Sequence, residues 1–194
     1  MWVRNAGERA EKAGRGRVLW IIGLATAVPL QGAVTPIAAI GDAIPDLPLV
    51  LVVLFALGHR RVTSVAAGAG VGALVDLLSA RAGLFHLVTY ALLAVVASSI
   101  GRVTANVRVV TALTVVAVCS VLLGIAYAVT GPPVEHADEM LRWLGRALAP
   151  QVVYNTAVGG ALFAVWIWRF PPSRRAVGER DELFSSGRFQ GLIR

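Results

Sequence analysis

The stretch from Val109 to Thr130, VVTALTVVAVCSVLLGIAYAVT, decides the fold class because it contains no charged side chain. A helix rises about 1.5 Å per residue, so an apolar run of about 20 residues crosses the ~30 Å hydrocarbon core of a bilayer. In both directions from this stretch, further apolar runs alternate with short segments that hold nearly all the charge. The pattern predicts an all-α integral membrane protein.

The composition of the whole chain agrees with this fold class. Hydrophobic residues make up 57% of the chain and the mean hydropathy is +0.72, whereas soluble domains are about 45–50% apolar. We expect a basic N-terminal segment (1–17), one membrane domain (18–170) and a flexible tail (171–194). The six predicted transmembrane helices are Val18–Ile40, Ile44–Leu57, Val62–Ala80, Leu84–Ile100, Val109–Thr130 and Leu148–Trp168.

Prolines mark the first two predicted helices as irregular. The second helix is short, about 21 Å long, and it opens with Pro45 and Pro48, which suit a first helical turn. A short span is tolerated where it packs inside a bundle or where the bilayer is thin. The first helix contains Pro29 and Pro36, so we expect a kink or a break there.

The distribution of basic residues predicts the orientation of the helices. With a cytoplasmic N-terminus, 15 of the 18 Lys and Arg residues fall on the cytoplasmic side, as the positive-inside rule requires. The three exceptions are Arg81, Arg142 and Arg146. We therefore expect both ends in the cytoplasm, and the indole rings at the inner interface would be those of Trp20, Trp166 and Trp168. The same rule accounts for the net charge of +7, so we expect no nucleic-acid partner.

Residues 131–147 form the longest predicted connection, on the outer side. Apolar residues recur near its end at helical spacing, while Arg142 and Arg146 lie elsewhere on the helical wheel. The apolar positions are Met140, Trp143, Leu144 and Leu148. This spacing is typical of a short amphipathic helix on the membrane surface. A solvated loop that runs into the last span is the alternative, and both remain open.

Asp76 is the one acidic residue well inside a predicted span, where an unpartnered carboxylate is costly. Ser64, Gly68, Gly72 and Asp76 are spaced by four residues, so they share one helix face. A face of small residues lets another helix approach closely. Two interpretations remain open: a surface that binds a partner's helix, or a packing seam inside the bundle that a hydrogen-bonded Asp76 closes.

The last span holds a second stripe of polar and small residues, formed by Gln151, Asn155 and Gly159 with Tyr154 beside it. Further polar residues lie in other spans and are candidates to satisfy Asp76: Gln31, His86 and Tyr90. Such contacts contribute roughly 1 kcal/mol each in membranes. The sequence leaves the pairing open, and His86 alone is more typical of a packed or interfacial histidine than of a ligand.

No pattern in the sequence is typical of catalysis. It lacks a G-x-S-x-G elbow, an H-E-x-x-H helix and a Gly-Lys phosphate loop. A pair of acids inside the spans is also missing, since we expect Asp42 and Asp46 at the outer rim. The single cysteine, Cys119, lies in an apolar run without metal-ligand spacing. We predict no catalytic residue, no cofactor and no metal site, and expect that the protein is not an enzyme.

Three segments resemble MreD, the rod shape-determining membrane protein of bacteria. Gly41–Leu51 (GDAIPDLPLVL) has the Pro-Asp-aliphatic opening of that family's second helix. Gly68–Ser79 (GAGVGALVDLLS) is similar to its glycine-rich third helix with an Asp-Leu-Leu ending. Pro150–Asn155 (PQVVYN) is similar to the Pro–x–x–x–(Tyr)–Asn pattern of its last helix.

Two single positions add to the resemblance. Gln31 stands where the family often has a Gln late in its first helix, and Gly83 precedes Leu84 where the family's next helix begins. The likeness extends from about Val18 to Phe170. The long outer loop, Pro48 and the C-terminal tail depart from the family pattern.

The resemblance implies a non-enzymatic part of the bacterial cell-elongation machinery in the cytoplasmic membrane. The implied partners are MreC, RodA, a class B penicillin-binding protein and the actin-like MreB, beside membrane lipid. The implied fold is the six-helix S-component fold of energy-coupling factor transporters. The residues expected to bind a partner or to hold the structure are Gln31, Pro45, Asp46, Ser64, Gly68, Gly72, Asp76, Gly83, Tyr154 and Asn155.

Two functions follow as hypotheses. The first is a membrane scaffold that receives the transmembrane helix of MreC on the Gly68/Gly72 face or at the outer rim around Asp46, in support of lateral peptidoglycan synthesis and rod shape. The second is a vitamin-binding S-component of a transporter, which requires an outward-facing cavity with convergent polar groups. A cavity filled by side chains would disfavour the second function.

Overall fold

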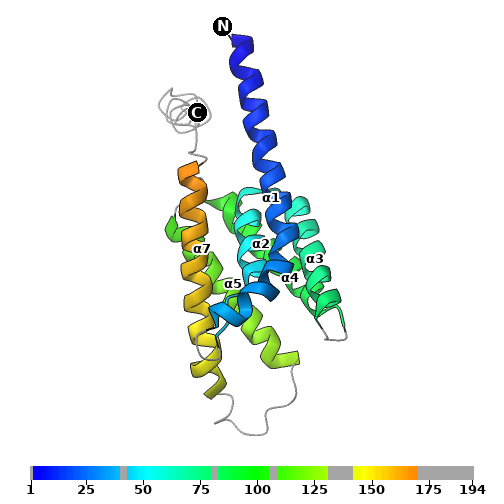
Figure 1. The fold of residues 1–194 in the computed structure, drawn as a ribbon, viewed down its shortest axis with the longest axis vertical. Helices are drawn as coiled ribbons and strands as arrows, with labels where there is room; N and C mark the ends of the chain where they lie inside the picture. The colour runs from blue at the N-terminus through cyan, green and yellow to red at the C-terminus, as the bar shows by residue number, and fades with distance from the viewer. Residues whose placement is uncertain (1, 40–42, 80–82, 105–108, 131–141, 170–194) are drawn as a thin grey trace, which may run out of the picture.

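The computed structural model describes residues 2–39, 43–79, 83–104, 109–130 and 142–169. These residues form an all-α bundle, which confirms the predicted fold class (Figure 1). Its elements are α1 (Trp2–Ala38), α2 (Leu47–Gly58), α3 (Arg61–Leu78), α4 (Phe85–Val103), α5 (Val109–Thr130), the π-helical turn η1 (Leu144–Leu148) and α7 (Ala149–Arg169).

Five of the helices are long and apolar enough to cross a membrane, so the chain is a multi-pass membrane protein. The spanning parts are Val18–Ile37 in α1, all of α3, α4 and α5, and Leu144–Arg169. The predicted span Val109–Thr130 coincides with α5, and the predicted bounds of α3, α4 and α7 are correct to within a few residues.

The helices run alternately in opposite directions along the bundle. As a result, the end of α7 lies at the same end of the bundle as the first half of α1, which projects beyond it (Figure 1). We call this the basic end because its described residues include Arg60, Arg61, Arg102 and Arg169. The opposite end, where α1, α3 and α5 finish and α2, α4 and α7 begin, is called the far end.

The short helix α2 occupies the centre of the bundle. Nine of its 12 residues are buried, and it packs against each of the other five helices. A helix that is apolar on all sides is typical of such a position. Twelve residues reach only about 18 Å, and protein, rather than lipid, surrounds most of α2.

The beginning of α2 differs from the prediction. The helix starts at Leu47 rather than Ile44, so Pro45 precedes it and only Pro48 lies in its first turn. The reason is that Asp46 caps the helix and therefore stands outside it.

Helix α1 continues through Pro29 and Pro36 without interruption. The break that we allowed for is therefore absent, and the axis of the second half of the helix bends instead (Figure 1). A proline removes one backbone donor and crowds the preceding turn, which is a sufficient cause for such a bend.

Helices α3 and α4 make the most extensive contact in the bundle. A Cβ atom added at Gly68 would lie 2.6 Å from the carbonyl oxygen of Tyr90, and one at Gly72 would overlap the carbonyl oxygen of His86. The backbone of α4 thus lies directly on the small-residue face of α3, where Ser64 is also buried. In the folded chain this face, the α3–α4 seam, is a packing seam and is not open to a partner's helix.

The last span begins earlier than predicted. Residues 142–169 form one continuous helix that includes the π-helical turn η1. Neither a separate surface helix nor a loop covers residues 142–147, and Met140 lies outside the described residues. Leu148 of this turn packs against Gly124 of α5, where a larger residue would collide with the Leu148 side chain.

Candidate functional site

Asp76, in the last turn of α3, binds the beginning of α4. Its Oδ1 accepts a hydrogen bond from the backbone N–H of His86 at 3.0 Å, and its Oδ2 accepts one from the N–H of Leu87 at 2.9 Å. The first N–H groups of a helix have no acceptor within the helix, and negative charge is favoured beside them. Asp76 is therefore an N-terminal cap for α4, which explains how this buried acid is tolerated.

The connection between α3 and α4 makes this cap possible. Gly83 has a φ of 135°, a conformation that residues with a side chain rarely adopt. Gly83 lies two residues before α4, whose first backbone N–H groups bind Asp76. The glycine that we expected at the start of the next helix is thus a turn residue.

The side chain of His86 connects Asp76 on α3 to Tyr127 on a third helix, α5. Its Nδ1 lies 2.6 Å from Oδ1 of Asp76, and its Nε2 lies 2.5 Å from the hydroxyl oxygen of Tyr127 on α5. When Nδ1 donates to the carboxylate, the Nε2 of a neutral imidazole accepts the proton of the tyrosine hydroxyl. The Asp–His–Tyr chain joins α3, α4 and α5.

Asp46 caps α2. Its Oδ1 accepts a hydrogen bond from the N–H of Leu49 at 2.9 Å. The hydroxyl of Tyr90, a fully buried side chain of α4, lies 2.9 Å from both carboxylate oxygens and donates to them. Asp46 lies half-buried at the far end of the bundle, where the cap and Tyr90 engage both of its carboxylate oxygens.

Gln31 joins α1 to the beginning of α2. Its Nε2 donates to the carbonyl oxygen of Pro45 at 2.6 Å, and its Oε1 accepts from the N–H of Leu47 at 2.9 Å. The side-chain amide thus satisfies both a donor and an acceptor of the segment that leads into α2.

Asn155 joins α7 to the same place. Its Oδ1 accepts from the backbone N–H of Asp46 at 2.7 Å, and its Nδ2 donates to the hydroxyl of Ser120 on α5 at 3.0 Å. Asn155 is almost completely buried. Through this one side chain, α2, α5 and α7 are bonded together.

These contacts form one cluster of groups at the far end, which we call the polar network. Its members are Gln31, Asp46, Asp76, His86, Tyr90, Ser120, Tyr127 and Asn155. In the part of the chain that the structure describes, every buried side-chain nitrogen or oxygen has a hydrogen-bond partner. The two carboxylates bind separate sets of donors and do not share a proton between them.

A cavity of about 350 Å³ adjoins the polar network. Seven of its lining side chains are polar, namely those of Gln31, Asp46, His86, Tyr90, Tyr127, Ser79 and Gln151. Its volume falls within the ~300–1,000 Å³ of small-molecule sites. The first five of these side chains are already hydrogen-bonded within the network, so a ligand would have to share or replace those bonds.

The structure brings some of the predicted site residues together and separates others. Gln31, Asp46, Asp76 and Asn155 join the network, and Pro45 contributes its carbonyl group. Ser64, Gly68 and Gly72 lie in the α3–α4 seam. Tyr154 is half-buried on α7, outside the network. Of the candidates to satisfy Asp76, His86 contacts it, whereas Tyr90 and Gln31 bind the segment around Asp46.

Sequence reasoning missed Ser120 and Tyr127. Both lie in α5, whose apolar character concealed them, but they are seven residues apart and therefore share a helix face. Two polar side chains on one face of a mostly apolar span were a usable signal, since each needs a partner inside the membrane.

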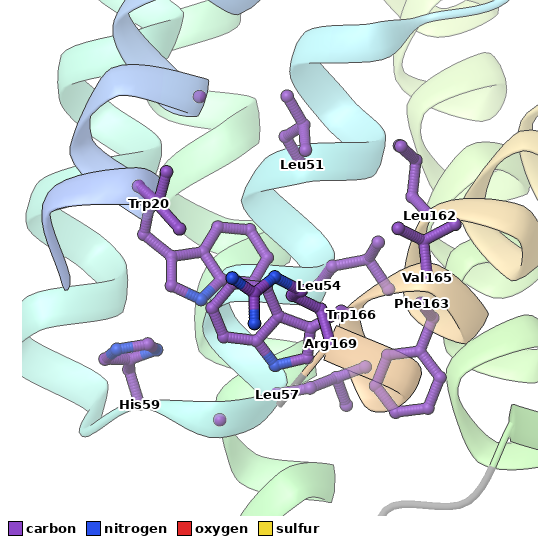
Figure 2. Close-up of a pocket in the computed structure, with 13 residues that line it drawn as sticks. Trp20, Leu51, Leu54, Leu57, His59, Leu162, Phe163, Val165, Trp166 and Arg169 are labelled. Atoms are coloured by element: carbon purple, nitrogen blue, oxygen red, sulfur yellow. The ribbon is translucent and has the colours of Figure 1, made fainter. Parts of the chain in front are cut away.

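A second hollow lies at the basic end, between α1, α2 and α7. This apolar groove has a volume of about 470 Å³, and Figure 2 shows its lining side chains. The ring centroids of Trp20 and Trp166 lie 4.9 Å apart across it. Arg169 and His59 also line it.

The chemistry available at the two sites differs. The polar network holds acids, an imidazole and two phenols, but its carboxylates are occupied as helix caps. Among the residues that the structure describes, no group of three His, Cys, Asp or Glu side chains is placed to hold a metal ion.

Comparison of the chain with protein-family models, with curated proteins and with solved structures finds no match.

Proposed function

We propose that this protein is a membrane scaffold of the bacterial cell-elongation machinery, similar to MreD, that binds the transmembrane segment of a single-pass partner such as MreC. In that role it supports lateral peptidoglycan synthesis and rod shape in the cytoplasmic membrane, together with RodA, a class B penicillin-binding protein and MreB. These partners are the ones that the resemblance of three segments to MreD implies.

The place of the MreD-like residues in the fold is the observation that carries this proposal. Gln31, Asp46, Asp76 and Asn155 come from four separate segments, and all of them take part in the polar network. Their hydrogen bonds fasten helices to one another, and both carboxylates are used as caps. A framework bonded internally in this way suits a protein that presents a fixed surface to its partners.

Helix α1 offers the least covered surface to a partner's helix. Only 17% of its spanning segment is buried, against 39% for α5. One exposed side of α1 carries residues of low bulk at spacings of four, three and four, which are Ala25, Pro29, Gly32 and Pro36. Helices associate in membranes where such residues allow the backbones to approach. We therefore place the partner's helix on this side of α1, because α4 already covers the Gly68/Gly72 face.

The surface can be tested with Gly32→Leu. No atom lies within 4 Å of the position that a Cβ would take at Gly32, so the folded chain accommodates a side chain there. We expect recovery of an MreC-type protein with the tagged chain to fall roughly ten-fold, which corresponds to about 1.4 kcal/mol of binding free energy. The measurement is quantitative mass spectrometry of proteins purified from native membranes.

Gly70→Leu is the matched control, because Gly70 lies on an exposed face of α3 with equally open space around its Cα. It should leave recovery unchanged. Equal recovery with both variants would contradict the α1 surface. Failure of the unaltered chain to recover any MreC-type protein would contradict the scaffold function itself.

A second candidate function is that of an S-component-like solute-binding protein. The cavity beside the polar network favours it, since that cavity has the size of a small-molecule site and several polar groups converge on it. Heat extraction of the purified protein followed by mass spectrometry decides between the two. A water-soluble compound recovered in stoichiometric amount would favour solute binding, and its absence would favour the scaffold.

A further inference from the structure

The apolar groove at the basic end has walls suited to hydrocarbon. Its floor is the side of α2 that carries Leu51, Leu54 and Leu57, and its flanks come from α1 and α7. Its volume of about 470 Å³ is that of a ligand pocket rather than of a packing defect, since native interiors contain few voids larger than a water molecule.

The groove is open toward the surroundings of the bundle. On the flank formed by α1, Leu19 is 50% exposed, and on the flank formed by α7, Val165 is 60% exposed. Both helices belong to the membrane-spanning set, so these side chains meet lipid rather than water. The groove is therefore open sideways to the bilayer.

The end of the groove nearest the basic end carries positive charge and aromatic rings. Arg169 lines it, and its guanidinium points toward the indoles of Trp20 and Trp166 in Figure 2. His59 closes the same end, and Arg60 follows it directly. Guanidinium groups bind phosphate through paired hydrogen bonds, and indole rings favour the headgroup level of a bilayer.

We propose that this groove is a binding site for one anionic phospholipid of the leaflet at the basic end. An acyl chain fills the space over α2, and the phosphate lies at Arg169. Charge complementarity selects this occupant over a zwitterionic lipid, because basic pockets between transmembrane helices favour anionic headgroups. The site is separate from the polar network and from the surface of α1 proposed for the partner's helix.

The experiment is native mass spectrometry of the full chain in mild detergent, titrated with phosphatidylglycerol or phosphatidylcholine of identical acyl chains. We expect one phosphatidylglycerol to bind with a roughly five-fold preference, the effect of about one cationic side chain near a membrane surface. Arg169→Gln should abolish this preference. Gly23→Phe should reduce binding of both lipids, because Gly23 lines the groove and has open space around it.

Two controls separate the site from general effects on the protein. Arg146→Gln removes an exposed charge at the far end, and Gly70→Phe adds a ring on an exposed face of α3; both should retain the preference. Equal binding of the two lipids by the unaltered chain would overturn the proposal, as would a preference that survives both groove variants. A change of oligomeric state in Gly23→Phe without loss of lipid would also overturn it, since a second copy would then be the occupant.

Discussion

At the scale of single residues, the two carboxylates of the polar network act as helix caps. Asp76 accepts two backbone N–H groups of α4, and Asp46 accepts one of α2. The hydrocarbon core offers no water to these groups, so a helix end inside a membrane must be satisfied by protein. An acid within a span commonly marks a functional pathway, but here the geometry gives both acids a structural role.

We expect Asp76→Ala to destabilise the protein by roughly 2–4 kcal/mol. The loss of a cap costs about 1 kcal/mol, and unsatisfied buried groups cost about 1–3 kcal/mol each. Asp76→Asn should cost less, because one acceptor remains. The measurement is reversible unfolding in mixed micelles, followed by tryptophan fluorescence.

Thr26→Ala provides the control, since the hydroxyl of the exposed Thr26 bonds only within its own helix. Its effect should stay within about 0.5 kcal/mol. An unfolding midpoint for Asp76→Ala equal to that of the unaltered chain would show that the cap contributes nothing.

The members of the polar network were partly predictable at this scale. Gln31, Asp76 and Asn155 stand out because polar side chains in apolar runs must find partners. Their pairing was not predictable, because the bonded residues are as far apart as 109 positions along the chain and their meeting depends on the rotation of each helix. Asp46 carried an unused signal, since an Asp shortly before a Pro at a helix start is typical of a cap.

At the scale of helices, the α3–α4 seam shows how glycine residues set the distance between the backbones of two helices. Gly68 and Gly72 permit the backbone of α4 to touch that of α3, and only this approach brings the N–H groups of His86 and Leu87 within reach of Asp76. The cap and the seam therefore depend on each other.

We expect Gly72→Ala and Gly70→Ala to have opposite effects on stability. A Cβ at Gly72 overlaps the backbone of His86, which cannot move without shifting α4, so the cost should be about 1–3 kcal/mol. Gly70 lies on the open side of the same helix, where alanine should be neutral or stabilise by up to about 1 kcal/mol.

Unfolding midpoints of the two variants in the same micelles provide the measurement. Because the substitutions are identical and only two positions apart, differences in helix propensity cancel. Similar midpoints for both variants would contradict the close approach of α3 and α4 at Gly72.

Hydropathy alone predicted the long helices well, since length and apolar character are the properties that the membrane requires. The errors lie at two helix boundaries. Helix α2 begins only after Asp46, although the apolar run starts at Ile44, because Gln31 binds the segment that precedes the helix. Residues 142–148 continue the last span as helix, although their helical spacing was interpreted as a separate surface helix or a loop.

At the scale of the whole molecule, the two ends of the bundle differ in character. At the far end, the side-chain hydrogen bonds of the polar network join α1, α2, α3, α4, α5 and α7. At the basic end, α1 and α7 flank α2 around an apolar groove. The hydrogen bonds at the far end keep the helices in a fixed arrangement, and the groove at the basic end leaves space for a lipid. The proposed scaffold function and the proposed lipid site are therefore compatible within one fold.

We predict that both ends of the described chain face the cytoplasm and that α2 crosses with the other helices. In a Cys119→Ala background, single cysteines replace exposed residues at the far end (Leu84, Gly145) and at the basic end (Val103, Trp168). An impermeant maleimide added to intact cells should label the first pair, and the second pair only after permeabilisation.

The same cysteine labelling also tests whether the short helix α2 crosses the membrane. Its length of about 18 Å is less than the hydrocarbon thickness, so we expect it to cross only because the surrounding helices shield it from lipid. A fifth position, Val18→Cys in α1, tests this point. If Val18→Cys and Trp168→Cys react from opposite sides of the membrane, the number of crossings is odd and α2 does not cross. Labelling of Val103→Cys and Trp168→Cys in intact cells would instead mean that the basic end faces outward, against the energetic preference that keeps arginine-rich ends on the cytoplasmic side.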